Sequence, residues 1–196
     1  MENMRFDVTA LGELLIDFTD NGKSGQGNSL FEANPGGAPC NVLAFLKKLG
    51  RSCAFVGKVG DDLFGHLLRD VAAEAGICMD YLVFDKDVRT TLAFVQTFAN
   101  GDRDFSFYRN PGADRELRED ELPLDVIASS RIFHFGSLSM THDGVRRATR
   151  KAIKCAKAGG ALLSFDPNLR QPLWESLDEA REQIEYGLTQ SDILKI

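Results

Sequence analysis

Polar residues that could bind a small molecule follow two apolar, strand-like runs of the sequence. Asp166, Asn168 and Arg170 follow the run at 161–165, and Asp17 closes the run that contains Leu14 and Ile16. In open parallel sheets, ligands bind beyond the carboxyl ends of the strands. The arginine offers a two-pronged donor for phosphate or carboxylate, so this group is suited to an anionic ligand. A structural Asp-Pro turn is the alternative interpretation of 166–170.

A glycine pair directly precedes a predicted helix in Pro35-Gly-Gly-Ala-Pro-Cys-Asn41. Gly36 and Gly37 let the backbone approach a ligand closely, and a helix start offers free N–H groups to oxygen atoms. Asn41 adds an amide that can both donate to and accept from hydroxyl groups. The simpler alternative is an ordinary helix start with Asn41 as its cap.

Two other glycine-containing segments have structural interpretations. In Gly57-Lys-Val-Gly-Asp-Asp-Leu-Phe-Gly65, Asp61 or Asp62 is better explained as a helix cap than as a base in an oxyanion loop. Gly22-Lys-Ser24 resembles the end of a phosphate-binding P-loop, but the first glycine of that motif would fall at Asp17 and no helix follows. We therefore interpret it as a turn.

Short apolar runs alternate along the chain with amphipathic helical patterns, which predicts an α/β fold with a mostly parallel sheet flanked by helices. Helical spacing is plain in Leu63, Leu67, Val71 and Ala75, which are four residues apart. The predicted strands are Phe6–Leu11, Ala54–Val59, Tyr81–Phe84, Arg131–Phe135, Ala161–Phe165 and Asp192–Ile196, and the predicted helices are Asn41–Leu49, Leu63–Ala75, Asp143–Ala158 and Asp178–Leu188.

Two segments interrupt this alternation, at 13–35 and 89–110. The second holds two alternating runs joined by Ala99-Asn-Gly-Asp102, and Asn-Gly between such runs is a strong hairpin signal. We expect the two segments to meet as one small antiparallel β-sheet, a lid over a cleft, beside an α/β core formed by 1–12, 36–88 and 111–196. Ordinary edge hairpins without a gating role are the alternative.

Composition excludes several classes of protein. The 196 residues carry a formal net charge of −6, which argues against a nucleic-acid partner. No apolar run is long enough to span a membrane, and no signal peptide is recognisable at the start. The four cysteines are scattered without a C-x-x-C pair, so we expect reduced thiols in the cytoplasm rather than a zinc site or disulfides, and we assign no metal ligands.

Five segments, in order, resemble the ribokinase-like PfkB carbohydrate kinases, and most closely the fructokinases of plants and bacteria. The last two favour fructokinase over ribokinase or adenosine kinase. One departure from the first family signature is Leu43, where a small residue is usual. The five are Gly12-Glu-Leu-Leu-Ile-Asp-Phe18, Pro35–Asn41, Gly57–Gly65, Phe107-Tyr-Arg-Asn-Pro-Gly-Ala-Asp114 and Ser164-Phe-Asp-Pro-Asn-Leu-Arg-Gln-Pro-Leu-Trp174.

The resemblance implies roles for these residues. The sugar hydroxyls would be held by Asp17, Gly36, Gly37 and Asn41, with Tyr108, Arg109 and Arg170 as further substrate contacts. Asn168 and Arg170 would also lie toward the transferred phosphate. The lid would close over the sugar and could pair with a second lid in a homodimer.

The resemblance also implies that part of the kinase lies beyond Ile196. The Gly-Ala-Gly-Asp run that supplies the anion hole and the aspartate base in this family is absent, as are the nucleotide pocket and the segment that helps to organise Mg²⁺. We therefore expect a fragment that carries no catalytic residue and is inactive alone. The expected reaction of the whole protein is ATP- and Mg²⁺-dependent phosphorylation of fructose to fructose 6-phosphate. Alternatives are a kinase for 2-keto-3-deoxygluconate or another sugar of this family, and a non-catalytic sugar-binding relative.

Overall fold

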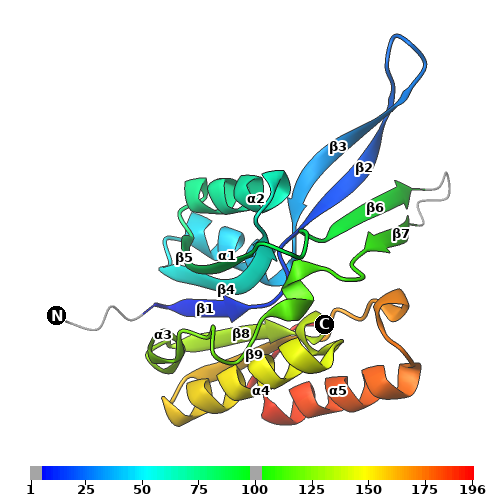
Figure 1. Ribbon diagram of the computed structural model, residues 1–196. Helices are drawn as coiled ribbons and strands as arrows, with labels where there is room; N and C mark the ends of the chain where they lie inside the picture. The colour runs from blue at the N-terminus through cyan, green and yellow to red at the C-terminus, as the bar shows by residue number, and fades with distance from the viewer. Residues whose placement is uncertain (1–5, 98–102) are drawn as a thin grey trace.

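The computed structural model describes residues 6–97 and 103–196 and shows a six-stranded parallel sheet with helices on both faces, as predicted (Figure 1). The strand order is β10-β9-β8-β1-β4-β5, and every neighbouring pair is parallel. The strands are β1 (Val8–Leu11), β4 (Cys53–Gly60), β5 (Cys78–Asp85), β8 (Ile132–Gly136), β9 (Leu162–Asp166) and β10 (Ile193–Leu194).

Figure 1 shows α1 and α2 on one face of this sheet and α4 and α5 on the other. Phe133, Phe135 and Phe165 stack across β8 and β9 and are fully buried. A second apolar cluster lies around Phe55 and Leu68. The helices are α1 (Ala38–Lys48), α2 (Leu63–Glu74), α3 (Leu124–Ala128), α4 (Asp143–Ala158) and α5 (Leu177–Gln190).

The predicted helix at 63–75 is present as α2, and the residues whose spacing indicated the helix are not the ones that it buries. Leu63 is 77% exposed, whereas Leu68 and Ala72 are buried. Asp62 begins α2, because its carboxylate accepts hydrogen bonds from the backbone N–H groups of Phe64 and Gly65. The capping interpretation of this segment is therefore confirmed.

The interrupting segments form a second sheet of four strands in the order β3-β2-β6-β7 (Figure 1). Two antiparallel hairpins are joined through a parallel pairing of β2 with β6. The predicted turn Ala99–Asp102 lies outside the described residues. The strands are β2 (Leu15–Lys23), β3 (Ser29–Gly36), β6 (Leu92–Thr97) and β7 (Arg103–Tyr108). We refer to this sheet as the lid.

Only three residues separate β1 in the core from β2 in the lid, and β3 leads through Gly37 directly into α1. The crossing between the two sheets therefore brings the starts of β2 and α1 to the carboxyl ends of the core strands. Within the described residues, no helix is both long and apolar enough to cross a membrane.

Candidate active site

A cavity of about 130 Å³ lies where the lid meets the carboxyl ends of the core strands. It brings together five of the predicted site residues. Asp17, Gly37, Asn41 and Arg170 were expected to bind the sugar, and Asn168 was expected, with Arg170, to lie toward the transferred phosphate. The rest of its lining is Glu13, Leu15, Ala38, Phe105, Phe107 and Leu138.

The glycine pair is required by the close approach of the β1–β2 segment. Gly37 has φ +120°, and a Cβ there would lie 2.4 Å from the carbonyl oxygen of Glu13. A Cβ on Gly36 would lie 2.3 Å from Oδ2 of Asp17. Gly36 itself does not line the cavity, so its contribution in this structure is to make room for the Asp17 carboxylate.

Glu13 is a site residue that the sequence analysis did not identify. Its side chain is 3% exposed, and its Oε1 accepts a hydrogen bond of 2.9 Å from the backbone N–H of Ala38. The preceding residue, Gly37, has no side chain to cap α1, so Glu13 takes that role from another part of the chain. Burial raises the pKa of Glu13 to about 7, against hydrogen bonding to Ala38 and the charge of Arg109, which lower it.

Asp17 projects from the start of β2 into the cavity opposite Arg170. Burial raises the pKa of Asp17, and the positive charge of Arg170 opposes that rise. The guanidinium carbon of Arg170 lies 5.5 Å from the ring centroid of Phe105, and within the described residues Arg170 forms no salt bridge. The cavity thus holds the Asp17 carboxylate, which can accept hydrogen bonds from hydroxyl groups, and the Arg170 guanidinium, which remains available to an anion.

The turn after β9 presents Asn168 and Arg170 through a local hydrogen bond. Oδ1 of Asp166 accepts from the backbone N–H of Asn168 at 3.1 Å, and Asn168 adopts φ +35°, which asparagine tolerates. The other carboxylate oxygen of Asp166 lies 2.8 Å from Nζ of Lys195. Asp166 is therefore a structural residue of the turn, as the Asp-Pro alternative holds, while its neighbours line the cavity.

Two of the residues predicted to contact substrate lie elsewhere. Side chains alternate along β7, so Phe105 and Phe107 face the cavity while Tyr108 lies on the opposite face of the lid, 65% exposed and 5.3 Å from the ring of Phe94. Sequence motifs alone do not reveal which phase of this alternation faces inward.

Arg109 is buried and fully engaged in holding the chain together. Its Nη2 lies 2.6 Å from Oδ2 of Asp114, its Nη1 donates to Thr141 at 2.9 Å, and Nη2 also donates to the carbonyl of Leu138 at 3.0 Å. Asp114 in turn accepts a hydrogen bond from Thr91. In this structure Arg109 ties the end of the lid to the core and does not line the cavity with Asp17.

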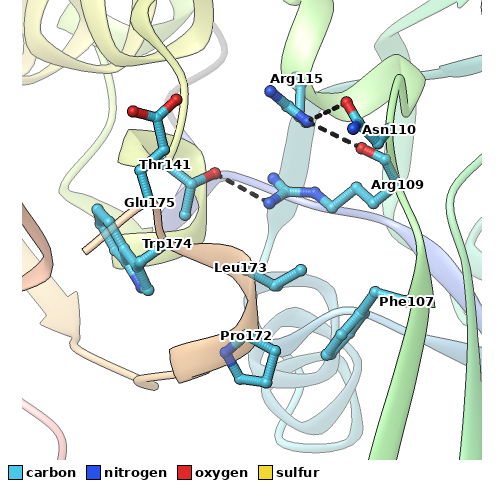
Figure 2. Close-up of a pocket in the computed structure, with 9 residues that line it drawn as sticks. All are labelled: Phe107, Arg109, Asn110, Arg115, Thr141, Pro172, Leu173, Trp174 and Glu175. Atoms are coloured by element: carbon cyan, nitrogen blue, oxygen red, sulfur yellow. Dashed lines mark hydrogen bonds between the residues drawn. The ribbon is translucent and has the colours of Figure 1, made fainter. Parts of the chain in front are cut away.

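A larger cavity of about 420 Å³ adjoins the first, and Phe107 lines both (Figure 2). It is bounded by the end of β7, by Arg115, by Thr141 and by the segment at 172–175. Phe107 is the one lining residue that the two cavities share, and Asp17, Gly37, Asn41, Asn168 and Arg170 do not line the larger one.

The described residues contain no cluster of three or more histidine, cysteine or acidic side chains that could hold a metal ion. What the first cavity offers is recognition of hydroxyl groups through Asp17, Asn41 and the backbone at Gly37, with Arg170 beside them for a negative charge.

Comparison with known proteins agrees with this description. Residues 5–196 match the family model described as "pfkB family carbohydrate kinase". The chain is 49% identical to "Probable fructokinase-2" of Arabidopsis thaliana over 96% of its own length, and 48% identical to "Fructokinase-2" of Solanum habrochaites, also over 96%. Its structure is similar to a crystal structure of fructokinase from Xylella fastidiosa, with a TM-score of 0.89 and 37% identity over 96% of this chain, and to the same enzyme with bound ATP, with a TM-score of 0.88 and 36% identity.

The chain spans 58% of the length of each of these two plant relatives, and 58% and 60% of the two bacterial structures. The family match extends over both sheets and over the segments that line the first cavity. The chain belongs to the pfkB family of carbohydrate kinases.

Proposed function

We propose that the whole protein transfers the γ-phosphoryl group of ATP to a hydroxyl of fructose, giving fructose 6-phosphate, and that this chain carries the sugar-binding half. The observation on which the proposal rests is the convergence of Asp17, Gly37, Asn41 and Arg170 on one cavity. The fructokinase relatives give the substrate, and the ATP-bound bacterial structure supports the nucleotide.

Each of these groups has a chemical task in such a reaction. The Asp17 carboxylate accepts hydrogen bonds from sugar hydroxyls, and the Asn41 amide can both donate and accept. Arg170 stands on the same cavity with no carboxylate partner among the described residues, so it is suited to neutralise charge on the phosphoryl group in transit. Phosphoryl transfer depends mainly on such positioning and charge stabilisation.

We assign no catalytic base within the described residues, and we expect the aspartate base beyond Ile196. In kinases Mg²⁺ is usually bound through substrate phosphates and one or two carboxylates, so we propose that it accompanies the nucleotide in the whole protein.

We also propose that the protein forms a homodimer through the lid and works in the cytoplasm. The lid face opposite the cavity carries Phe31 and Tyr108, which are 50% and 65% exposed, and Phe94 contacts both rings. An exposed apolar surface of this kind supports association. The four cysteines are unpaired, which is typical of a reducing compartment.

Calorimetry with fructose on the chain and on Asp17→Asn tests the proposed sugar site. Asparagine keeps the size of the side chain but removes its charge, so the affinity for fructose should fall at least about tenfold, the loss typical of a charged hydrogen bond. Asp20→Asn is the matched control, since Asp20 lies on the same strand but is exposed and outside the cavity. Equal fructose affinities of the chain and of Asp17→Asn would refute the assignment of Asp17. Tighter binding of 2-keto-3-deoxygluconate than of fructose would identify that sugar acid as the substrate instead.

A further inference from the structure

The larger cavity in Figure 2 has features of a second ligand site that the proposed kinase reaction does not use. Its volume of about 420 Å³ lies in the range of roughly 300–1,000 Å³ that is typical of small-molecule sites. Its lining comes from three stretches that are distant in sequence, 107–115, 141 and 172–175, so its shape depends on the folded core and lid together.

The walls of this cavity combine aromatic and polar groups. In Figure 2 the rings of Trp174 and Phe107 lie on opposite sides, with Pro172 and Leu173 between them. Aromatic and apolar walls with a few oriented polar groups are usual where a small molecule binds. Apolar side chains of this kind can cover the C–H face of a sugar ring.

The polar groups at the cavity leave both hydrogen-bond donors and acceptors available to a ligand. Nη1 of Arg115 donates to the carbonyl of Arg109 at 3.1 Å and to Oδ1 of Asn110 at 3.2 Å, which fixes the guanidinium in place. Hydrogen bonds from Nη2 of Arg115 and from the amide nitrogen of Asn110 do not occur within the described residues. The exposed carboxylate of Glu175 supplies an acceptor.

The charges at the cavity balance, and this balance selects the class of ligand. Asp114 neutralises Arg109 at 2.6 Å, which leaves one positive group, Arg115, and one negative group, Glu175. Neither of these two forms a salt bridge within the described ranges. An anion would gain from Arg115 but would be repelled by Glu175, whereas a neutral hydroxyl can use both because it donates and accepts.

Two buried N–H groups beside the cavity also lack partners in the described part of the chain. They are Nε of Arg115 and Nε1 of Trp174, and Trp174 is 8% exposed. Most buried donors in folded proteins are satisfied, so each such group calls for an explanation. A hydroxyl-rich ligand that shifts these side chains slightly would supply acceptors to both.

From these observations we infer that the cavity lined by Phe107, Asn110, Arg115, Trp174 and Glu175 binds a neutral polyhydroxylated molecule, a sugar or polyol, separately from the cavity that contains Asp17. The inference does not rest on the proposed kinase function. Because Phe107 lines both cavities, a ligand in the second would restrain one wall of the first.

The chain contains its own probe, because Trp174 is its single tryptophan. Titration with fructose should change the intrinsic fluorescence of Trp174 and reach saturation. The Asp17→Asn variant, altered only in the first cavity, should keep this response. Glu175→Gln and Arg115→Gln should each weaken it about tenfold, as expected for the loss of a hydrogen bond to a charged group. Glu175 is exposed, so its variant tests the site even where Arg115→Gln fails to fold.

The outcomes separate this inference from the proposed function. If calorimetry shows fructose binding that depends on Asp17 but Trp174 fluorescence does not change, the second site is refuted and the sugar site in the first cavity is still supported. If the fluorescence response persists in Asp17→Asn and calorimetry shows no difference in fructose binding between the chain and this variant, only the second site is supported. Loss of the fluorescence response in Asp17→Asn, or a saturable response to inorganic phosphate in place of fructose, would overturn the inference of a separate site for neutral ligands.

Discussion

Glu13 should make the chain less stable as the pH rises from about 4.5 to 7, and Glu13→Gln should remove that effect. Its carboxylate is buried between the β1–β2 segment and the start of α1, and burial raises its pKa from 4.5 to about 7. Because the folded chain binds this proton more tightly than the unfolded chain, stability is greatest at low pH and falls as the pH rises from about 4.5 to 7. This direction is opposite to that of a carboxylate held in an ion pair.

The size of the effect follows from the same pKa. At about 1.4 kcal/mol for each tenfold change in proton affinity, a rise from 4.5 to about 7 costs the ionised folded state about 3 kcal/mol at high pH. Most of this cost is relieved between pH 8 and pH 5 as the proton binds. Glutamine keeps the acceptor for the Ala38 N–H but has no proton to bind, so the variant lacks this dependence.

Urea unfolding of the chain and of Glu13→Gln at pH 5, 6, 7 and 8 measures the difference directly. Other titrating groups are present in both proteins, so their contributions cancel in the comparison. The stability of the variant relative to the wild-type chain should be greatest at pH 8 and should fall by about 2–3 kcal/mol at pH 5. Glu32→Gln, at an exposed position of the lid, is the matched control and should follow the wild-type chain at every pH. If Glu13→Gln shows the same pH dependence as the wild-type chain, the reasoning about its buried charge is wrong.

Three further substitutions test other parts of the structure. Gly37→Ala would place a Cβ 2.4 Å from the carbonyl of Glu13 in a left-handed conformation, so we expect a loss of about 1–3 kcal/mol in urea unfolding together with loss of fructose binding by calorimetry. Arg109→Lys cannot replace the paired donors to Asp114 and should cost about 3–5 kcal/mol in the same unfolding assay, whereas a change below about 1 kcal/mol would show that this pair is dispensable. Asp62→Ala removes the cap of α2 and should lower stability by about 1–2 kcal/mol without changing fructose affinity.

The sequence was sufficient to predict which motifs would converge. Asp17, Asn41 and Arg170 each stand next to a predicted strand or helix boundary, and a parallel sheet brings such boundaries to one edge. Most of the polar residues that line the first cavity could therefore be predicted from residue type together with the strand–helix alternation.

The buried face of α2 and the direction of the Tyr108 side chain depend on tertiary contacts, which the local sequence pattern does not specify. In α2 the spacing of Leu63 and Leu67 indicated a helix correctly, but packing against the sheet buries the adjacent stripe that includes Leu68. Tyr108 and Phe107 are neighbours of similar type, and only the pairing of β7 with β6 determines which of them faces the cavity. Pattern alone left these choices open because tertiary packing decides them.

Glu13 escaped the sequence analysis for a different reason, since its partner, the N–H of Ala38, lies 25 residues away. A glutamate two residues after an apolar strand, at a position that the fold must bury, was the available signal. The helix that Glu13 caps begins with glycine, alanine and proline, none of which can cap it with a side chain. An uncapped helix start is thus a clue that a distant polar residue must supply the acceptor.

The β1–β2 segment links the stability of the core to the geometry of the lid. Glu13 binds the start of α1, and four residues later Asp17 projects from the lid into the same cavity. The hairpin of β2 and β3 is connected to the cavity through both strands. β2 carries Asp17, and β3 runs through Gly36 and Gly37 into α1. Any displacement of the hairpin relative to the core must therefore move Asp17 with respect to Asn41, which is carried by α1. A sugar that binds both residues favours one position of the lid, so binding and lid position are coupled through covalent connections as well as through contacts.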